Sequence, residues 1–453
     1  MIPLTLGEVA AIVGGTTTSP DVVVEGPAYV DNRRPEERGL FVAIAGERVD
    51  GHDFAEGAHA VLGSRPTAAP TVVVGDPTVA LGRLARHVVD RLDVDVLALT
   101  GSQGKTSTKD LLAQVLAADA PTVATAANNN NELGVPLTVL RADAGTRHLV
   151  VEMGARGIGH IAYLCEICPP TIAAVLNIGT AHVGEFGGRD AIARAKGEIV
   201  EALPPSGTAV LNADDPLVAV MAPRTVAHVS TFGLSGDVRW RDMSLDARGR
   251  ASFDLGHDGA WAPVVLRQTG AHQVANAGAA AAMALAAGVS LAAVADALSR
   301  ATAASRWRME LTERTDGLLV LNDAYNANPD SMLAALDALA GLGAARSGRT
   351  IAVLGEMLEL GDEHDEAHVQ VGRAAVAAGI DRVVVVGPGA AGIARGVEER
   401  GSEAIVTAGQ HAALDWVRKN AGADDVVLVK ASRASALEQV AERLLDDVPP
   451  AAT

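Results

Sequence analysis

The sequence predicts an α/β protein with three domains, and three observations support this prediction. The chain has 453 residues, which is too many for a single ordinary hydrophobic core. From Val94 onward, apolar runs alternate with helical stretches, as in proteins built on parallel sheets. Before that point, short β-like runs are separated by Gly and Pro. These changes in pattern divide the chain into residues 1–92, 93–312 and 313–453.

Each predicted domain contains apolar runs of strand length. In the first domain the runs are short. In the second and third they alternate with helical stretches, which indicates parallel strands in a doubly wound arrangement. The predicted strands are residues 22–24, 41–44 and 71–74; then 94–99, 148–151 and 172–176; and finally 318–321, 351–354, 382–386 and 426–429.

The composition is that of a globular protein with a strong negative charge. Apolar residues make up 49% and charged residues 20% of the chain. The net charge of -18 disfavours nucleic-acid and membrane-surface binding, because both partners are polyanions. The uncharged segment Ala277–Ala295 is mostly alanine and is interrupted at Gly288, so we expect two packed helices rather than a membrane span. Since no secretory signal is visible, a cytoplasmic location is expected.

The chain has two cysteines, Cys165 and Cys168, in a C-x-x-C spacing. This spacing is compatible with a redox motif or with half of a zinc site. However, there is no second pair, and Pro169 follows at once. We therefore favour buried thiols that pack at the end of a helix.

Gly101 begins a segment that is typical of phosphate binding. It follows an apolar run and precedes a predicted helix start, where backbone N–H groups bind anions. Lys105 would reach the β- and γ-phosphates of ATP, and Thr106 would bind Mg²⁺. Leu99 occupies the first glycine position of the general motif, so the alternative is a chance glycine-rich turn. The residues of this predicted phosphate loop are Gly101, Ser102, Gln103, Gly104, Lys105, Thr106 and Ser107.

Polar residues that could complete a phosphoryl-transfer site follow two other apolar runs. Glu152 comes directly after residues 148–151, and His182 closely follows residues 172–176. The carboxyl ends of parallel strands are where α/β sites gather, and Mg-ATP needs ligands beyond the phosphate loop. The alternative for both residues is an exposed or structural position. Taken alone, Lys196 is an ordinary helix-surface lysine.

Eight segments together resemble the Mur ligase family of peptidoglycan biosynthesis, and they run in order along almost the whole chain. The resemblance implies a first domain that binds a UDP-sugar, a central P-loop-type ATP-binding domain, and a Rossmann-like third domain that closes over the site. The segments are Thr100–Lys109, Asn130–Leu140, Glu152–Ala155, Asn177–Gly187, Ala195–Ile199, Asn322–Met332, Leu354–Gly361 and Lys430–Arg433.

The resemblance also implies a mechanism. A substrate carboxylate is activated as an acyl phosphate, an amine attacks it, and phosphate leaves. Lys105 and Thr106 would serve ATP and Mg²⁺, and Glu152 and His182 would be Mg²⁺ ligands. Lys196 matches the lysine that is carbamylated in the family, whose carbamate helps to hold a second Mg²⁺.

Further site residues follow from the resemblance alone. The sequence differs from the family pattern at three positions: Asn32 stands where the family has serine, Gln273 where it has asparagine, and Ala431 where it has glycine. The expected nucleotide contacts are Asn276, Arg306 (with Arg308 two residues away), Asp323 and Asn328. The histidine expected in the third domain is His364. The expected contacts to the UDP-substrate are Asp31, Asn32, Arg33, Arg48, Asp50, His52, Asn130 and Asn131.

The segment Asp323–Pro329 bears most on the substrates. Within the family it favours a reaction between UDP-N-acetylmuramoyl-tripeptide and D-alanyl-D-alanine. A monomer is expected separately from this segment. The alternatives within the superfamily are the ligase that adds the third peptide residue and a folylpolyglutamate synthase. The alternative to an enzyme is a nucleotide-gated binding or regulatory module. Such a module would bind ATP without releasing ADP when both substrates are present.

Overall fold

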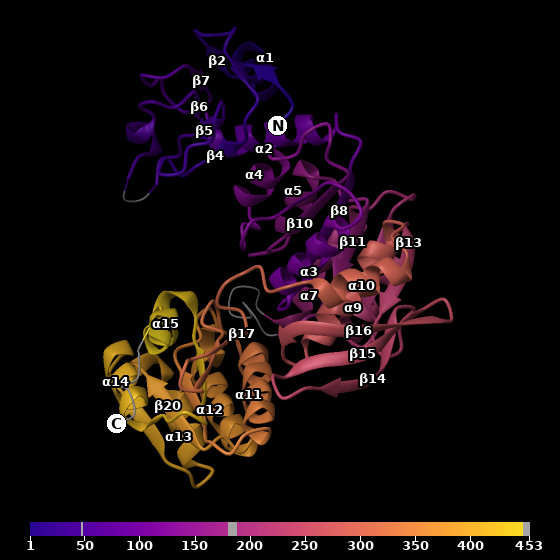
Figure 1. Ribbon diagram of the computed structural model, residues 1–453. Coiled ribbons are helices and arrows are strands. Elements are labelled where there is room, and N and C mark those ends of the chain that lie inside the picture. Colours follow the sequence, from indigo (N-terminus) through magenta and orange to yellow (C-terminus); the bar gives the residue numbers. More distant parts are fainter. Residues whose placement is uncertain (47–48, 180–187, 447–453) are drawn as a thin grey trace.

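The computed structural model describes residues 1–46, 49–179 and 188–446, and it contains three α/β units in chain order (Figure 1). The first unit is built on a five-stranded sheet of order β2-β7-β6-β5-β4, parallel except for β2. Its strands are β2 (Thr16–Thr17), β4 (Ala28–Tyr29), β5 (Leu40–Val42), β6 (Ala60–Gly63) and β7 (Thr71–Val73), beside a small pair of β1 (Leu4–Thr5) and β3 (Val23–Val24). Its helices are α1 (Leu6–Val13), η1 (Gly51–Phe54) and α2 (Pro77–Val89).

The central unit is built on a six-stranded parallel sheet of order β13-β12-β11-β8-β10-β9. Apolar side chains of β8 alternate between two cores on its two faces, as expected for a strand covered by helices on both sides. The strands are β8 (Asp95–Thr100), β9 (Thr122–Ala124), β10 (His148–Glu152), β11 (Ile172–Val175), β12 (Thr208–Asn212) and β13 (His228–Phe232). The helices are α3 (Lys105–Ala117), α4 (Gly134–Val139), α5 (His160–Ile167), α7 (Arg189–Glu201), α8 (Pro216–Ala219), η2 (Ala222–Arg224), α9 (Gln273–Ala286) and α10 (Leu291–Arg300).

The alanine-rich segment forms two helices, α9 and α10, as the sequence predicted. The chain turns between them at Gly288, whose φ is +91°. In the described part of the chain, no helix combines the length and apolar character that a membrane span requires. The segment is instead part of the core between the central sheet and a three-stranded antiparallel sheet.

That antiparallel sheet was not predicted from the sequence. It consists of β14 (Arg239–Leu245), β15 (Arg250–His257) and β16 (Ala260–Thr269). Its inner face packs against α9: Phe253, Leu255 and Leu266 are buried in the core, whereas β14 is largely exposed. β14 and β15 lack the continuous apolar runs that marked the parallel strands, and the run of residues 260–266 in β16 was not recognised as a strand.

The third unit is built on a sheet of order β17-β18-β22-β19-β20-β21, parallel except for β17. All four predicted strands of this region are found. β17 crosses the predicted division between residues 312 and 313, so the third sheet begins by Glu310. The strands are β17 (Glu310–Glu313), β18 (Leu319–Asn322), β19 (Thr350–Leu354), β20 (Arg382–Val386), β21 (Ala404–Thr407) and β22 (Val426–Lys430). The helices are α11 (Pro329–Ala344), η3 (Gly361–Glu363), α12 (His364–Ala377), η4 (Pro388–Ala390), α13 (Ala391–Glu398), α14 (Gln410–Asn420), η5 (Arg433–Ser435) and α15 (Glu438–Asp446).

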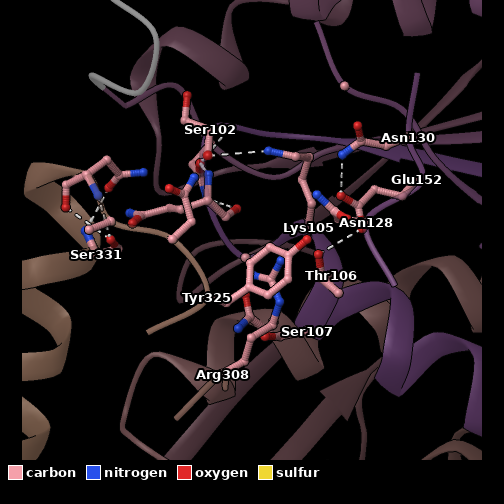
Figure 2. A pocket seen from close by; sticks show the side chains of 18 of the residues that line it. Ser102, Lys105, Thr106, Ser107, Asn128, Asn130, Glu152, Arg308, Tyr325 and Ser331 are labelled. Atoms are coloured by element: carbon pink, nitrogen blue, oxygen red, sulfur yellow. Dashed lines mark hydrogen bonds between the residues drawn. The ribbon is translucent and has the colours of Figure 1, made fainter. Parts of the chain in front are cut away.

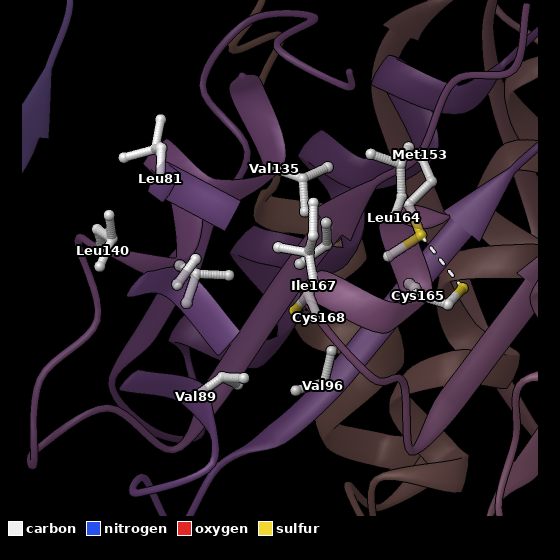
Figure 3. Close-up of a cluster of buried hydrophobic side chains, with 14 of the residues drawn as sticks. Leu81, Val89, Val96, Val135, Leu140, Met153, Leu164, Cys165, Ile167 and Cys168 are labelled. Atoms are coloured by element: carbon white, nitrogen blue, oxygen red, sulfur yellow. Dashed lines mark hydrogen bonds between the residues drawn. The ribbon is translucent and has the colours of Figure 1, made fainter. Parts of the chain in front are cut away.

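The first two units share one apolar core around α2, α4 and α5 (Figure 3). Leu81 of α2 and Val135 of α4 are fully buried in it. Cys165 and Cys168 are free thiols buried in the same core, and burial raises the pKa of Cys165 to about 12. Cys165 donates its S–H to Sδ of Met153 at 3.7 Å, which agrees with the packing role favoured from the sequence.

Leu81→Ala should test the shared core. We expect it to lower the free energy of unfolding by about 3 kcal/mol, because it opens a cavity in a fully buried cluster. The measurement is urea unfolding followed by circular dichroism. Leu234→Ala is the matched control, since Leu234 is 65% exposed and its loss should change stability by less than about 0.5 kcal/mol. Equal effects of the two changes would contradict a core shared by the two units.

Candidate active site

The phosphate loop joins the end of β8 to the start of α3. Gly104 has a φ of +77° and precedes Lys105, the first residue of the helix. A Cβ atom at Gly104 would lie 2.5 Å from Oδ1 of Asn276 on α9. Glycine is therefore needed here for two reasons, the left-handed backbone and the close approach of another side chain.

Asn177, which follows β11, braces the phosphate loop. Its Oδ1 accepts hydrogen bonds from the backbone N–H groups of Ser102 and Gln103, both at 3.0 Å. Its Nδ2 donates to the carbonyl oxygen of Gln103 at 3.1 Å. Asn177 was not predicted as a site residue. It stands at the carboxyl end of a predicted strand, and the same position identified Glu152.

Two lysines converge on the carbonyl oxygen of Gly101. Nζ of Lys105 donates to it at 2.7 Å, and Nζ of Lys196, which projects from α7, donates to it at 3.0 Å. Burial lowers the pKa of Lys105. Burial, reinforced by the charge of Lys105, holds the pKa of Lys196 well below its usual range. Lys196 is therefore not the exposed helix residue that its sequence context alone suggested.

Glu152, at the end of β10, is held through both carboxylate oxygens (Figure 2). Its Oε2 accepts a hydrogen bond from Oγ1 of Thr106 at 2.9 Å, and its Oε1 accepts one from Nδ2 of Asn130 at 2.7 Å. Glu152 is 1% exposed. A buried carboxylate beside a hydroxyl offers the oxygen donors that Mg²⁺ prefers.

The described side chains supply only part of a metal site. Among residues 1–46, 49–179 and 188–446, no three His, Cys, Asp or Glu side chains are grouped so that they could hold a metal ion. The donors Thr106 and Glu152 fit Mg²⁺ when further oxygens come from a bound phosphate. His182, which was predicted as a metal ligand, lies outside the described residues.

The phosphate loop, Glu152, Asn177 and Lys196 line one wall of a cavity of about 450 Å³. The third unit supplies the opposite wall. On that wall, Oδ2 of Asp323 lies 2.5 Å from Nζ of Lys430, and Oδ1 accepts from the backbone N–H of Met309 at 3.0 Å. Asn328 caps α11 through the N–H of Ser331 at 2.9 Å. The predicted nucleotide contacts Asn276, Asp323 and Asn328 thus face the same cavity as the phosphate loop.

Arg306, another predicted nucleotide contact, does not line this cavity, and this prediction needs correction. Its side chain is 69% exposed and pairs with Glu442 of α15 at 2.7 Å. Arg308 lines the cavity instead, with its guanidinium 4.2 Å from the ring centroid of Tyr325. Trp307 between the two arginines has a φ of +60°, which breaks the extended alternation that would place residues two apart on one side.

The predicted UDP-substrate residues fall into two groups. Asn130 and Asn131 line the cavity, whereas the described residues Asp31, Asn32, Arg33, Asp50 and His52 are not among its lining residues. Asp31 and Arg33 form an ion pair of 2.8 Å on the surface of the first unit, near Asn32. His52 is buried, with Nδ1 2.5 Å from Asp50 and Nε2 accepting from the N–H of Ser64 at 2.8 Å.

Arg48 and His364 are the remaining residues predicted from the sequence. Arg48 lies outside the described residues. His364, at the start of α12, does not line the cavity; its Nε2 lies 3.0 Å from Oε1 of Glu356.

Comparisons with known proteins agree with this geometry. Two family models match the chain: the Mur ligase middle domain over residues 99–284, and the Mur ligase, glutamate ligase domain over residues 307–433. The chain belongs to the Mur ligase family. It is similar over 99% of its length to the UDP-N-acetylmuramoyl-tripeptide–D-alanyl-D-alanine ligase of Mycobacterium bovis, with 44% identity and 98% of that relative covered.

Solved structures show the same three-unit fold. MurF from Acinetobacter baumannii superposes with a TM-score of 0.88 at 33% identity, covering 98% of this chain and 99% of that one. The MurF ligase from Thermotoga maritima in complex with ADP superposes with a TM-score of 0.79 at 30% identity, covering 92% and 96%. The protein is therefore an enzyme of the ligase class.

Gly104→Ala should weaken nucleotide binding at least about tenfold, because the added Cβ meets Asn276 and alanine resists the left-handed backbone. Calorimetric titration with ADP and Mg²⁺ measures this. Gly57→Ala is the matched control: Gly57 has a φ of +78° but nothing within 4 Å of an added Cβ. ADP affinity retained by Gly104→Ala would show that nucleotide does not use this loop.

Proposed function

We propose that this enzyme joins the amine of D-alanyl-D-alanine to the terminal peptide carboxylate of UDP-N-acetylmuramoyl-tripeptide, with conversion of ATP to ADP and phosphate. The observation that carries the proposal is the convergence of Lys105, Glu152 and Lys196 in one cavity between the central and third units. The full-length relative from Mycobacterium bovis bears the name of this reaction. The chain covers 98% of that relative's length.

The first chemical step brings two anions together. A carboxylate oxygen of the peptide attacks the γ-phosphorus of ATP, the bond to the ADP oxygen breaks, and an acyl phosphate forms. The ammonium of Lys105 and the backbone N–H groups of the phosphate loop offset the repulsion, and bound Mg²⁺ supplies further positive charge. In the second step the neutral amine attacks the acyl carbon, phosphate leaves, and the amine loses a proton as the amide forms.

Lys196 is suited to carbamylation, which we propose as part of the same site. Its neutral amine would add to CO₂ and release one proton to solvent, and the burial that lowers its pKa favours this neutral form. The product is an anion, so the repulsion with Lys105 becomes attraction. Together with Glu152 and His182, the carbamate would provide ligands for two Mg²⁺ ions.

The remaining assignments extend this proposal to both substrates. Asn276, Arg308, Asp323 and Asn328 would contact the nucleotide, with Arg308 replacing Arg306. Asn130 and Asn131 would lie beside the peptide. We further propose that the enzyme acts in the cytoplasm as a monomer. The proposed uridine-side contacts are Asp31, Asn32, Arg33, Arg48, Asp50 and His52.

Phosphate release tests the function directly. With ATP, Mg²⁺ and UDP-N-acetylmuramoyl-tripeptide present, D-alanyl-D-alanine should give a rate at least about tenfold above that with D-alanine or L-lysine, since a site built for a dipeptide leaves polar groups unpaired with a single amino acid. Omitting the UDP-substrate is the control and should leave only background release. A rate no higher with the dipeptide than with single amino acids would exclude the proposed acceptor.

Lys196→Ala should lower the ligation rate by at least about a hundredfold at ordinary Mg²⁺, because a metal ligand and its charge are lost. Acetate should restore part of the rate by placing a carboxylate in the vacated space. Lys419→Ala, at an exposed position of α14, should leave the rate unchanged. If Lys196→Ala retained the wild-type rate, the carbamate proposal would be wrong.

A further inference from the structure

Lys109 is a buried lysine on α3 that does not line the cavity. Its Nζ donates to the carbonyl oxygens of Thr125 at 2.9 Å and of Ala127 at 3.3 Å, and it lies 2.5 Å from Oδ1 of Asp110. The three N–H groups of the ammonium therefore have three acceptors. Two of these acceptors belong to one loop, so the ammonium fixes the path of that loop.

Residues 125–131, which we call the asparagine loop, are tied at one end to β10 and at the other to Gly154, two residues after β10. The N–H of Thr125 donates to the carbonyl oxygen of Val150 at 2.9 Å, and the carbonyl oxygen of Asn130 accepts from the N–H of Gly154 at 2.8 Å. Between these ties, Ala127 has a φ of +50°, a left-handed conformation that alanine rarely adopts without support. The carbonyl contacts of Lys109 supply that support.

The asparagine loop in turn orients Glu152. Nδ2 of Asn130 donates to Oε1 of Glu152 at 2.7 Å, while Oγ1 of Thr106 donates to Oε2 at 2.9 Å. Both carboxylate oxygens are thus set from helix α3: one directly by Thr106, and the other by Lys109 through the loop and Asn130. The helix that presents the phosphate loop also orients this carboxylate.

We propose that Lys109 is a positioning residue for Glu152 and that it sets the affinity for Mg²⁺ through Asn130. The inference rests on the proposed function, because Glu152 is there assigned to Mg²⁺. Lys109 touches neither the cavity nor a reacting atom, so its effect is on the metal and not on nucleotide contacts. A lysine needed only for folding would change stability and leave the magnesium requirement alone.

The test compares Lys109→Met/Asp110→Asn with Asp110→Asn alone, in the full chain. The double variant removes the ammonium together with its carboxylate, so no unpaired charge stays buried. The control keeps both carbonyl contacts. We expect the double variant to need about tenfold more Mg²⁺ for half-maximal ADP binding in calorimetric titrations, in line with the loss of charge-assisted hydrogen bonds. ADP affinity without Mg²⁺ should stay within about twofold of the control.

A second comparison asks whether the effect passes through Asn130. Adding Asn130→Ala to the double variant should raise the magnesium requirement by less than about twofold, because the two changes break one chain of contacts. If the methionine variant does not fold, Lys109→Gln/Asp110→Asn carries the test, with a rise of about threefold expected because the neutral amide donates weaker hydrogen bonds than the ammonium.

Three results would overturn the proposal: an unchanged magnesium requirement, fully additive effects with Asn130→Ala, or an equal loss of ADP binding without Mg²⁺. Failure of the proposed function would be distinguishable. In that case the wild-type enzyme itself would show no Mg²⁺-dependent ADP binding, or no phosphate release that depends on D-alanyl-D-alanine.

Discussion

Two lysine amines share the carbonyl oxygen of Gly101, and the chemistry of the site depends on this contact. Lys105 and Lys196 reach it at 2.7 Å and 3.0 Å. Two ammonium groups that are both removed from water and brought together repel each other, so the neutral form of one is favoured. Burial, together with the charge of Lys105, lowers the pKa of Lys196, which is 4% exposed. This contact favours the uncharged amine of Lys196 beside the phosphate loop.

The central sheet brings the partners of this contact together. β8 lies between β10 and β11, so the phosphate loop has Glu152 on one side and Asn177 on the other. Helix α7 packs against β8 and β11, which places Lys196 beneath the loop. Glu152 and Asn177 meet the phosphate loop because their strands end at the same edge of the sheet as β8, where α/β proteins bind ligands. Lys196, 95 positions from Gly101, reaches the loop from helix α7.

The sequence predicted the parts of this arrangement that depend on local pattern. The apolar run before Gly101 and the glycine spacing predicted a strand, a turn and a helix start, and the structure has all three. The interruption at Gly288 separated α9 from α10. The edge strand β14 was missed because it is exposed along most of its length and has no apolar run to reveal it.

Long-range contacts were not predictable in the same way. Burial of Lys196 depends on helix packing, and nothing in its neighbours along the chain distinguishes it from an exposed lysine. Asn177 stands at a predicted strand end, but its bonds to Ser102 and Gln103 depend on which strands are neighbours. The choice between Arg306 and Arg308 depended on one backbone angle, that of Trp307, which no residue pattern specified.

The left-handed backbone of Trp307 also bears on how the third unit comes to form one wall of the cavity. Trp307 and Met309 both have left-handed backbones, and both are bonded to the third unit: the carbonyl oxygen of Trp307 accepts from the N–H of Tyr325 at 3.2 Å, and Met309 donates to Asp323. Strained residues persist only where their surroundings hold them. Of the residues that hold this link, Met309, Asp323 and Tyr325 also line the cavity, and Arg308 lines it beside them. The cavity is therefore built from the central unit, the link and the third unit together.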